Sequence, residues 1–227
     1  MKKQQSMIDY VYESLKSAIY EQKLVPGQKL VENDISNSLS ISRTPIRHAF
    51  SRLKEEGFLT ILPNRGAMVI NPSVDEIADA FIHRKQLELL ASEKIMESIS
   101  ADDITRLKEL IQLEKETHTQ KNLVNYIKVN KEFHYLLINS CNNRFLINHA
   151  KKMIDQTHIY LALYDRFYFI PEKKDIRGPN EHQMLIEYIE QNKAEAFFSL
   201  LATHITSAID EYKNRVQHFH QAKDLFN

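Results

Sequence analysis

The sequence predicts a mainly α-helical protein with two domains: a small N-terminal domain that includes one strand pair, and a larger all-helical bundle. Apolar residues recur at helical spacing along most of the 227 residues. Only 4 Gly and 6 Pro are present, too few for a barrel with many tight turns or for a Gly-rich nucleotide fold. Strand-like sequence around a turn signal is confined to residues 58–70. Because Pro72 interrupts the chain after that segment, we expect the domains to be residues 1–71 and 72–227.

The composition is that of an ordinary globular protein, with 43% hydrophobic and 26% charged residues. No run of about 18 apolar residues occurs, so we expect no transmembrane helix and no membrane partner. The polar, basic start, residues 1–6, is not followed by the apolar core of a signal peptide. A single cysteine, Cys141, excludes an internal disulfide and suits a reducing compartment. These features predict a cytoplasmic protein.

The net charge of zero conceals a small asymmetry between the two domains. Residues 1–70 contain 10 basic and 7 acidic residues, a net charge of +3, whereas the remainder has a net charge of −3. Nine of the ten histidines also lie after residue 70. The difference is weak by itself, but it suggests that the two domains bind different partners.

The N-terminal domain is expected to contain three helices followed by a hairpin. The expected elements are helices at about 7–21, at 32–39 and from Ser42 to a stop at Gly57, then strands at 58–62 and 67–70. A Val-Pro-Gly turn at residues 25–27 ends the first helix. Ser42 is a plausible N-cap of the third helix, and Pro45 fits its first turn.

This order of elements is typical of a winged helix-turn-helix, in which the third helix reads DNA. Its basic residues are Arg43, Arg47, Arg52 and Lys54, with His48 beside them and no acidic residue from Ser42 to Lys54. Ser42, Arg43 and Thr44 open the helix, where side chains can reach base edges. Arg65, in the turn of the hairpin, is placed to touch the minor groove or the backbone. The alternative is a solvated basic surface, but the hairpin and the absence of acids favour DNA binding.

The segment LVPGQKLVENDISNSLSISRTPIRHAFSRLKEEGFL, followed by PNRGAMV, closely resembles the DNA-binding domain of GntR-type bacterial transcription factors over about residues 7–70. The resemblance implies a winged-helix dimer bound to a short inverted repeat in double-stranded DNA. The DNA contacts that it implies are Ser42, Arg43, Thr44, Arg47 and Gly66. One departure is Asn33, where many relatives have Arg, so base preference or affinity is expected to differ.

The second domain is expected to be a bundle of about six helices. Their expected ranges are 75–98, 102–118, 122–140, 144–166, 175–191 and 193–219. Ser73 and Glu76 have the spacing of a capping box at the start of the first of them. Arg84 and Glu88 fall on the apolar stripe of that helix.

Four residues of this bundle have the chemistry of a metal site. Asn130 and His134 lie four residues apart and so on one helix face, while His182 and His204 lie on two further helices. Three imidazoles and a side-chain oxygen suit Zn²⁺, with Ni²⁺ or Mn²⁺ as alternatives, and leave positions open for water or ligand. The alternative is that each histidine is an ordinary core or surface residue, because the prediction requires three helices to converge.

The same pattern resembles the FCD ligand-binding domain of the FadR-type branch of GntR regulators, over about residues 75–219. The resemblance implies a metal held by Asp or Asn and three histidines. Six helices resemble the shorter VanR-like subgroup. Asn130, in place of the commoner Asp, removes a negative charge from the expected ligands.

Arg84 is the main candidate for binding an effector. Residues 84–88 resemble the Arg-x-x-Leu-Glu stretch whose arginine meets an effector carboxylate in relatives. An arginine on an inner helix face must be paired, and a guanidinium fork suits a carboxylate. The alternative is an internal salt bridge to Glu88, four residues away. Arg177, and Arg166 or Tyr164, are further candidates for the same site.

The sequence therefore predicts a homodimeric transcriptional regulator, most often a repressor in this family, that senses a small organic or sugar acid through a metal. One alternative is a metal-dependent, hydrolase-like enzyme, because three histidines and an open position also suit hydrolysis. Against it, Glu181 is the one acidic neighbour of these histidines in sequence, and helical geometry directs it about 100° away from His182. The other alternative is a regulator with a purely structural metal and no effector.

Overall fold

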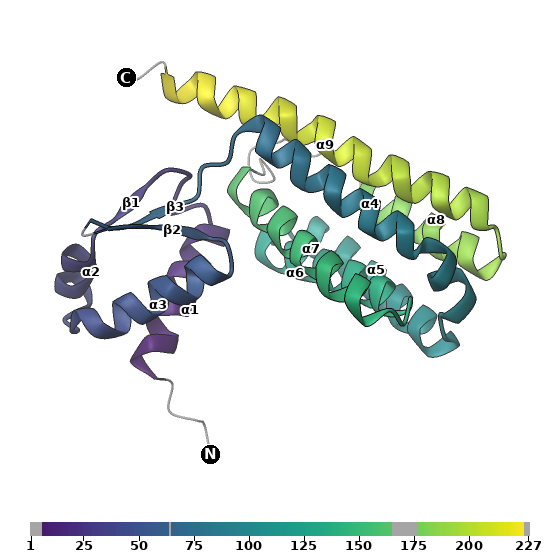
Figure 1. Cartoon of the computed structure of the whole chain (residues 1–227), viewed down its shortest axis with the longest axis horizontal. Helices are drawn as coiled ribbons and strands as arrows, with labels where there is room; N and C mark the ends of the chain where they lie inside the picture. The colour runs from purple at the N-terminus through teal and green to yellow at the C-terminus, as the bar shows by residue number, and fades with distance from the viewer. Residues whose placement is uncertain (1–5, 64, 165–176, 225–227) are drawn as a thin grey trace. The chain divides into compact units, whose positions relative to one another are not determined.

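The computed structural model describes residues 6–63, 65–164 and 177–224, with side chains to residue 211. The chain forms two compact units, Met1–Pro72 and Ser73–Asn227 (Figure 1). In the sequence, the boundary between them lies one residue after the expected one. We describe each unit by itself. In the part of the chain that the structure describes, none of the helices combines the length and the apolar character needed to span a bilayer.

The first unit has the expected helices and hairpin, together with one short strand that was not expected. Its elements are α1 (Met7–Tyr20), β1 (Lys29–Leu30), α2 (Glu32–Leu39), α3 (Arg43–Glu55), β2 (Leu59–Leu62) and β3 (Gly66–Val69). The strands form an antiparallel sheet in the order β1-β3-β2, with Lys29 opposite Met68 and Leu59 opposite Val69. Two residues are too few to show an alternating pattern, which explains why β1 could not be predicted.

The core of this unit lies between α1, α3 and the sheet. The predicted apolar stripe of α3 is confirmed, since Ile46, Ala49, Phe50 and Leu53 are all buried. Ser42 occupies the N-cap position with extended backbone, but its side chain makes no capping hydrogen bond. The predicted N-cap position is therefore confirmed, although the Ser42 hydroxyl does not bond to the helix.

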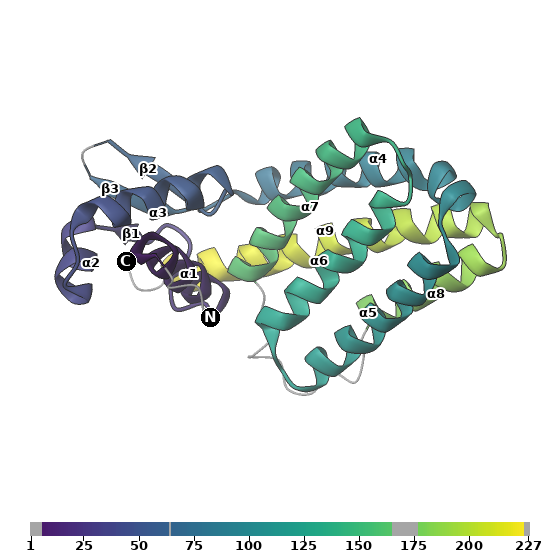
Figure 2. The same cartoon turned by 90° about the horizontal axis from the view of Figure 1, so that it is seen from below.

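The second unit has six helices in its described part, as expected. They are α4 (Val74–Ser98), α5 (Ala101–Thr119), α6 (Leu123–Asn139), α7 (Arg144–Tyr164), α8 (Arg177–Glu190) and α9 (Ala194–Asp224). The long helices α4 and α9 lie side by side, α4 also packs on α7, and α5 packs on α6 and α8 (Figures 1 and 2). Fully buried apolar residues such as Phe133, Leu185 and Phe197 fill the space between the helices.

The start of α4 departs from the expected capping box. The Ser73 hydroxyl accepts from the Glu76 backbone N–H at 3.1 Å, which is one half of the motif. The Glu76 carboxylate instead accepts a hydrogen bond from the Tyr160 hydroxyl of α7 at 3.2 Å. A complete capping box is present at the start of α5, between Ser100 and Asp103.

Candidate nucleic-acid interface and metal centre

The opening of α3 presents an exposed polar surface. Ser42, Arg43, Thr44 and Arg47 are all exposed, and the first turn contains no acidic residue. Arg47 Nε donates to Glu32 Oε2 of α2 at 2.8 Å. This ion pair joins α3 to α2. The arrangement suits phosphate and base contacts from a helix N-terminus.

Arg52 is basic but has a different role from the residues that open α3. It donates to Asp9 of α1 at 2.7 Å, and its guanidinium lies 3.9 Å from the centre of the Tyr12 ring. Hydrogen bonds from Ser6 and Arg52 lower the pKa of the Asp9 carboxyl below its ordinary value. Arg52 therefore ties α1 to α3, and counting it with the DNA-facing charges overstated that surface.

The other two residues expected to touch DNA are Arg65, in the turn between β2 and β3, and Gly66, at the start of β3. Arg65 is exposed, and its backbone N–H donates to Leu62 O at 2.9 Å. Gly66 has φ +89°, and a Cβ there would lie 2.2 Å from the carbonyl oxygen of Leu30 in β1. Glycine is therefore required for the close approach of β1 to β3, whatever it does at DNA. Asn33 is exposed on α2.

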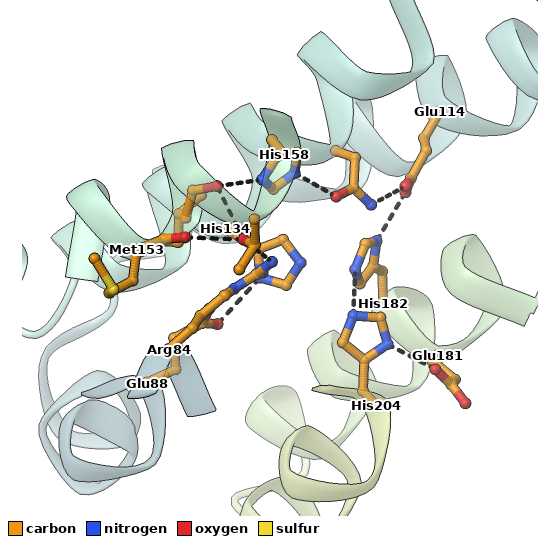
Figure 3. Close-up of polar contacts among 12 residues, drawn as sticks. Arg84, Glu88, Glu114, His134, Met153, His158, Glu181, His182 and His204 are labelled. Carbon is orange, nitrogen blue, oxygen red and sulfur yellow. Dashed lines mark hydrogen bonds and ion pairs between the residues drawn. The ribbon is translucent and has the colours of Figure 1, made fainter. Parts of the chain in front are cut away.

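In the second unit, the three predicted histidines come together from three helices. His134 lies on α6, His182 on α8 and His204 on α9 (Figure 3). One ring nitrogen from each lies within 4.8 Å of the other two, and His182 Nε2 is 3.3 Å from His204 Nε2. His134 and His182 are buried, and the His204 side chain is 13% exposed. The convergence that the sequence required is present.

Each of these imidazoles has a carboxylate at its other nitrogen. Nδ1 of His134 lies 3.1 Å from Glu88, that of His182 lies 2.8 Å from Glu114, and that of His204 lies 2.6 Å from Glu181 (Figure 3). An ionised carboxylate can only accept, so the proton of each neutral ring is on Nδ1 and the lone pair is on Nε2.

This arrangement of donors fits a divalent cation. Two Nε2 lone pairs 3.3 Å apart, on His182 and His204, repel each other unless a cation or a proton lies between them. Carboxylates that hold Nδ1 are the usual outer partners of metal-binding histidines. Three neutral imidazole donors suit Zn²⁺ and its first-row neighbours.

The protonation of the cluster agrees with this chemistry. Burial, helped by the nearby charge of Arg84, lowers the pKa of His134 well below its ordinary value, and burial also lowers the pKa of His204. Burial would raise the pKa of Glu88, but the charge of Arg84 and the hydrogen bonds from His134 and Arg84 outweigh it and hold that pKa far below the usual range. For Glu181, burial is outweighed by hydrogen bonds from His204 and Arg177, which lower the pKa to about 2. His134 and His204 are thus neutral near pH 7, and Glu88 and Glu181 are ionised.

None of these three carboxylates was predicted as a histidine partner by reasoning from the sequence. Glu114 lies on α5 and belongs to no motif, and Glu88 was considered only as a partner of Arg84. The available signal was that Glu114 continues the buried stripe of Leu107, Leu110 and Ile111. A carboxylate in such a position must have polar partners on a neighbouring helix. Glu181 does point away from His182, and it contacts His204 instead.

Asn130 lies beside the three histidines and is engaged at both ends of its amide. Its Nδ2 donates to Glu114 Oε1 at 2.6 Å, and its Oδ1 lies 2.8 Å from His158 Nε2. His158 is buried on α7, and its Nδ1 lies 2.7 Å from the Ile154 carbonyl oxygen. Asn130 thus connects α5, α6 and α7 through polar contacts.

Arg84 forms the internal salt bridge to Glu88 that the sequence analysis gave as an alternative, and one of its amino groups makes no hydrogen bond to the described residues. It is 5% exposed, and its Nε donates to Glu88 Oε1 at 2.5 Å while Nη1 donates to Thr157 Oγ1 at 3.1 Å. Its Nη2 is buried and has no hydrogen-bond partner among the described residues. Because Glu88 also contacts His134, one carboxylate joins Arg84 to the histidine cluster.

The other effector candidates are placed differently. Arg177 opens α8 and donates to Glu181 Oε1 at 2.7 Å, with its side chain 45% exposed. It therefore supports the carboxylate that holds His204. Tyr164 is buried at the end of the described part of α7, and Arg166 lies outside the described residues.

Comparison with known families divides the chain at the same place as the fold. Residues 8–69 match the model of bacterial regulatory proteins of the gntR family. Residues 79–207, more than half of the chain, match the model of the FCD domain.

Individual relatives agree with these matches. The HTH-type transcriptional regulator YdhC of Bacillus subtilis (strain 168) is 25% identical over 204 residues, 89% of each protein. The HTH-type transcriptional repressor RspR of Escherichia coli (strain K12) is 26% identical over 127 residues, 56% of each protein.

Solved structures share the fold. E. coli McbR/YncC has a TM-score of 0.73 at 20% identity, covering 92% of this chain and 98% of the other. A putative GntR regulator from Rhodococcus sp. RHA1 has a TM-score of 0.71 at 21% identity, covering 90% and 96%. The matched families, the relatives and the fold agree, and the chain belongs to the GntR family of transcriptional regulators, with an N-terminal GntR helix-turn-helix domain and an FCD domain.

Proposed function

We propose that this regulator is a cytoplasmic homodimeric repressor whose affinity for its operator changes when a small organic or sugar acid binds the metal-loaded helical unit. Its six described helices suit the VanR-like subgroup of the family. The relative RspR is named a transcriptional repressor, which supports repression as the function of this regulator. In such an allosteric protein, the acid changes the affinity for DNA, and DNA changes the affinity for the acid by the same factor.

The observation that carries this proposal is the buried Arg84 Nη2 without a partner, joined through Glu88 to the histidine cluster. A Zn²⁺ ion, or Ni²⁺ or Mn²⁺, held by His134, His182 and His204 would supply positive charge and open coordination positions. A carboxylate is the ligand that both the ion and an arginine attract. An amino group buried without a partner destabilises the folded chain, so a ligand that accepts from it gains affinity.

Assembly follows from how little DNA one winged helix reads. Each α3 contacts a few base pairs, so tight and specific binding requires two copies on two half-sites of an inverted repeat. We therefore expect a dimer in solution. A monomer by sedimentation at micromolar concentration that still binds its operator tightly would contradict this.

The hydrolase alternative is less well supported than binding. The carboxylates Glu88, Glu114 and Glu181 all accept hydrogen bonds from imidazole Nδ1, so each is committed to orienting a ring. A general base must instead be able to reach a water or substrate proton.

The test is a thermal-shift screen of organic and sugar acids with the Zn²⁺-loaded protein, because a specific ligand raises the melting temperature. Acids that bind are then titrated into the protein on an operator selected from random DNA, with DNA affinity measured by fluorescence anisotropy. If no acid in the panel raises the melting temperature, or none that does so changes operator affinity, the metal is structural and the proposal of an effector is wrong.

Arg84→Lys sharpens this test because lysine keeps the positive charge beside Glu88 and removes the guanidinium fork. We expect the variant to keep its metal and to bind the acid about tenfold or more weakly. Arg106→Lys, an exposed position on α5, is the matched control. Unchanged acid affinity in Arg84→Lys would remove Arg84 from the effector site.

A further inference from the structure

Glu114 is the most deeply buried acidic residue next to the histidine cluster. It lies on α5 with 0% of its surface exposed. Its Oε2 lies 2.8 Å from His182 Nδ1, and its Oε1 accepts from Asn130 Nδ2 at 2.6 Å. Both oxygens are therefore committed, one to a candidate metal ligand and one to Asn130.

Glu114 differs from the other two carboxylates in its lack of a cation. Glu88 is paired with Arg84 and Glu181 with Arg177, in each case an arginine four residues earlier on the same helix. In the described part of the chain, Glu114 has no lysine or arginine within ion-pair distance, and the residue four before it is Leu110. Its negative charge is thus not balanced by a basic side chain as the other two are.

The position of the Glu114 carboxylate affects how strongly a metal ion would bind at His182. Burying a carboxylate without a cation destabilises the folded chain, whereas a positive ion nearby offsets that cost. A cation on Nε2 of His182 would lie directly across the ring from the Glu114 carboxylate. A carboxylate at the outer nitrogen also makes an imidazole a stronger donor to a metal.

The same geometry accounts for an amide at residue 130. The atom of Asn130 that faces Glu114 is 2.6 Å from its oxygen, so an aspartate there would bring two carboxylates together in a buried place. An amide can donate in that position. Glu114 and Asn130 are thus complementary, with the acid on α5 and the amide on α6.

We propose that Glu114 supplies the negative charge of this metal centre, acting through His182 as a positioning residue, and that it also holds Asn130 in place beside the three histidines. This inference rests on the proposed function only in requiring an ion at the three histidines. It assigns to the site an acidic residue that lies one ring away from the metal.

The experiment measures Zn²⁺ and Mn²⁺ affinity of the full chain by competition with a chromophoric chelator, and the melting temperature of the metal-free protein. Glu114→Gln keeps the size of the side chain, and we expect it to weaken ion binding about 10- to 100-fold. Its metal-free melting temperature is expected to stay the same or rise, because a buried unbalanced charge is removed. A merely structural role for Glu114 would instead lower the metal-free melting temperature.

Two matched substitutions test the role of charge. Glu181→Gln also removes a carboxylate from an imidazole, but Arg177 already balances Glu181, so we expect a smaller loss of ion affinity than in Glu114→Gln. Glu116→Gln changes an exposed residue on the same helix and should leave ion affinity unchanged. Equal losses in Glu114→Gln and Glu181→Gln would overturn the charge argument.

A double-mutant cycle tests the pairing with Asn130. Asn130→Asp is expected to lower the metal-free melting temperature, because it places two carboxylates in contact. Asn130→Asp combined with Glu114→Gln restores one acid and one amide, and should recover most of that loss. If the two substitutions simply add, the residues are not paired as we propose.

The possible failures are distinguishable. If the wild-type protein binds neither ion, the metal in the proposed function is wrong. If the wild type binds and Glu114→Gln binds equally well, Glu114 does not act on the metal and only this inference fails. A Glu114→Gln variant that does not fold would also overturn it, since the expected change in metal-free stability is neutral or positive.

Discussion

The two units hold their functional side chains in opposite environments. In the first, Arg43 and Arg47 lie exposed in the first turns of one helix, where we expect DNA to replace the water that solvates them. In the second, His134, His182 and Glu114 are buried between helices, and each makes a specific polar contact. An exposed site needs only a correctly placed helix, whereas a buried one needs every polar group to find a partner. Substitutions of these exposed arginines should therefore affect binding alone, whereas substitutions of the buried histidines should affect binding together with stability.

The largest expected effect is that of His182→Ala. The ring stacks on Phe133 with 4.0 Å between ring centres and contacts both Glu114 and His204, so its loss removes one of three donors and strands a buried carboxylate. We expect ion affinity to fall by at least about 100-fold and the helical unit to lose about 2–5 kcal/mol of stability. Elemental analysis after parallel dialysis, together with thermal unfolding, measures both.

His83→Ala is the control for that experiment, because His83 is exposed on α4. It should retain the metal content of the wild type. Equal metal content in the wild type and His182→Ala would reduce the cluster to ordinary core histidines.

The next effect is on DNA binding alone. Arg43→Ala should lower operator affinity by about 1–3 kcal/mol if Arg43 pairs with a guanine edge, without changing thermal stability. Arg47→Ala should have an effect of the same sign. Arg52→Ala is the matched control, because Arg52 is committed to Asp9 and Tyr12 and should change stability more than DNA affinity. If Arg43→Ala binds like the wild type, the opening of α3 does not read the operator.

The smallest expected effect is a difference between the two units in how their stability depends on pH. Burial lowers the pKa of His134 and His158 well below 6.5, so these rings take up protons only when the helical unit unfolds. Their contribution to the stability of the helical unit is fully present above pH 6.5. As the pH falls below 6.5, the free energy of unfolding decreases by up to about 1.4 kcal/mol per pH unit for each ring. The first unit has one histidine, His48, which is exposed, and it has no buried histidine among its described residues.

Differential scanning calorimetry of the metal-free protein between pH 7.5 and 5.5 measures this difference. Only the melting transition of the helical unit should move to lower temperature, and operator DNA identifies the other transition by raising it. Equal shifts of both transitions would show that the buried histidines are not responsible.

Much of the first unit could be predicted because its signals are local. The apolar spacing of Ile46, Phe50 and Leu53 predicts a helix that buries one face, and the turn residues around Gly66 predict the hairpin. The two-residue strand β1 has no such signal, and its pairing with Met68 and Ala67 arises only when the chain folds back. The ion pair between Arg47 and Glu32 likewise joins two helices that no local pattern connects.

The sequence by itself determined which residue types were present at helical spacing: histidines 134, 182 and 204, an acid or amide before them, and Arg84 on an inner face. Only the tertiary structure decided how they are used. It placed Glu114 of α5 between His182 and Asn130, joined Glu88 of α4 to His134 of α6, and assigned Glu181 of α8 to His204 of α9. The physical reason is that a buried polar group is satisfied by whichever partner a neighbouring helix presents, and that neighbour lies tens of residues away in the chain.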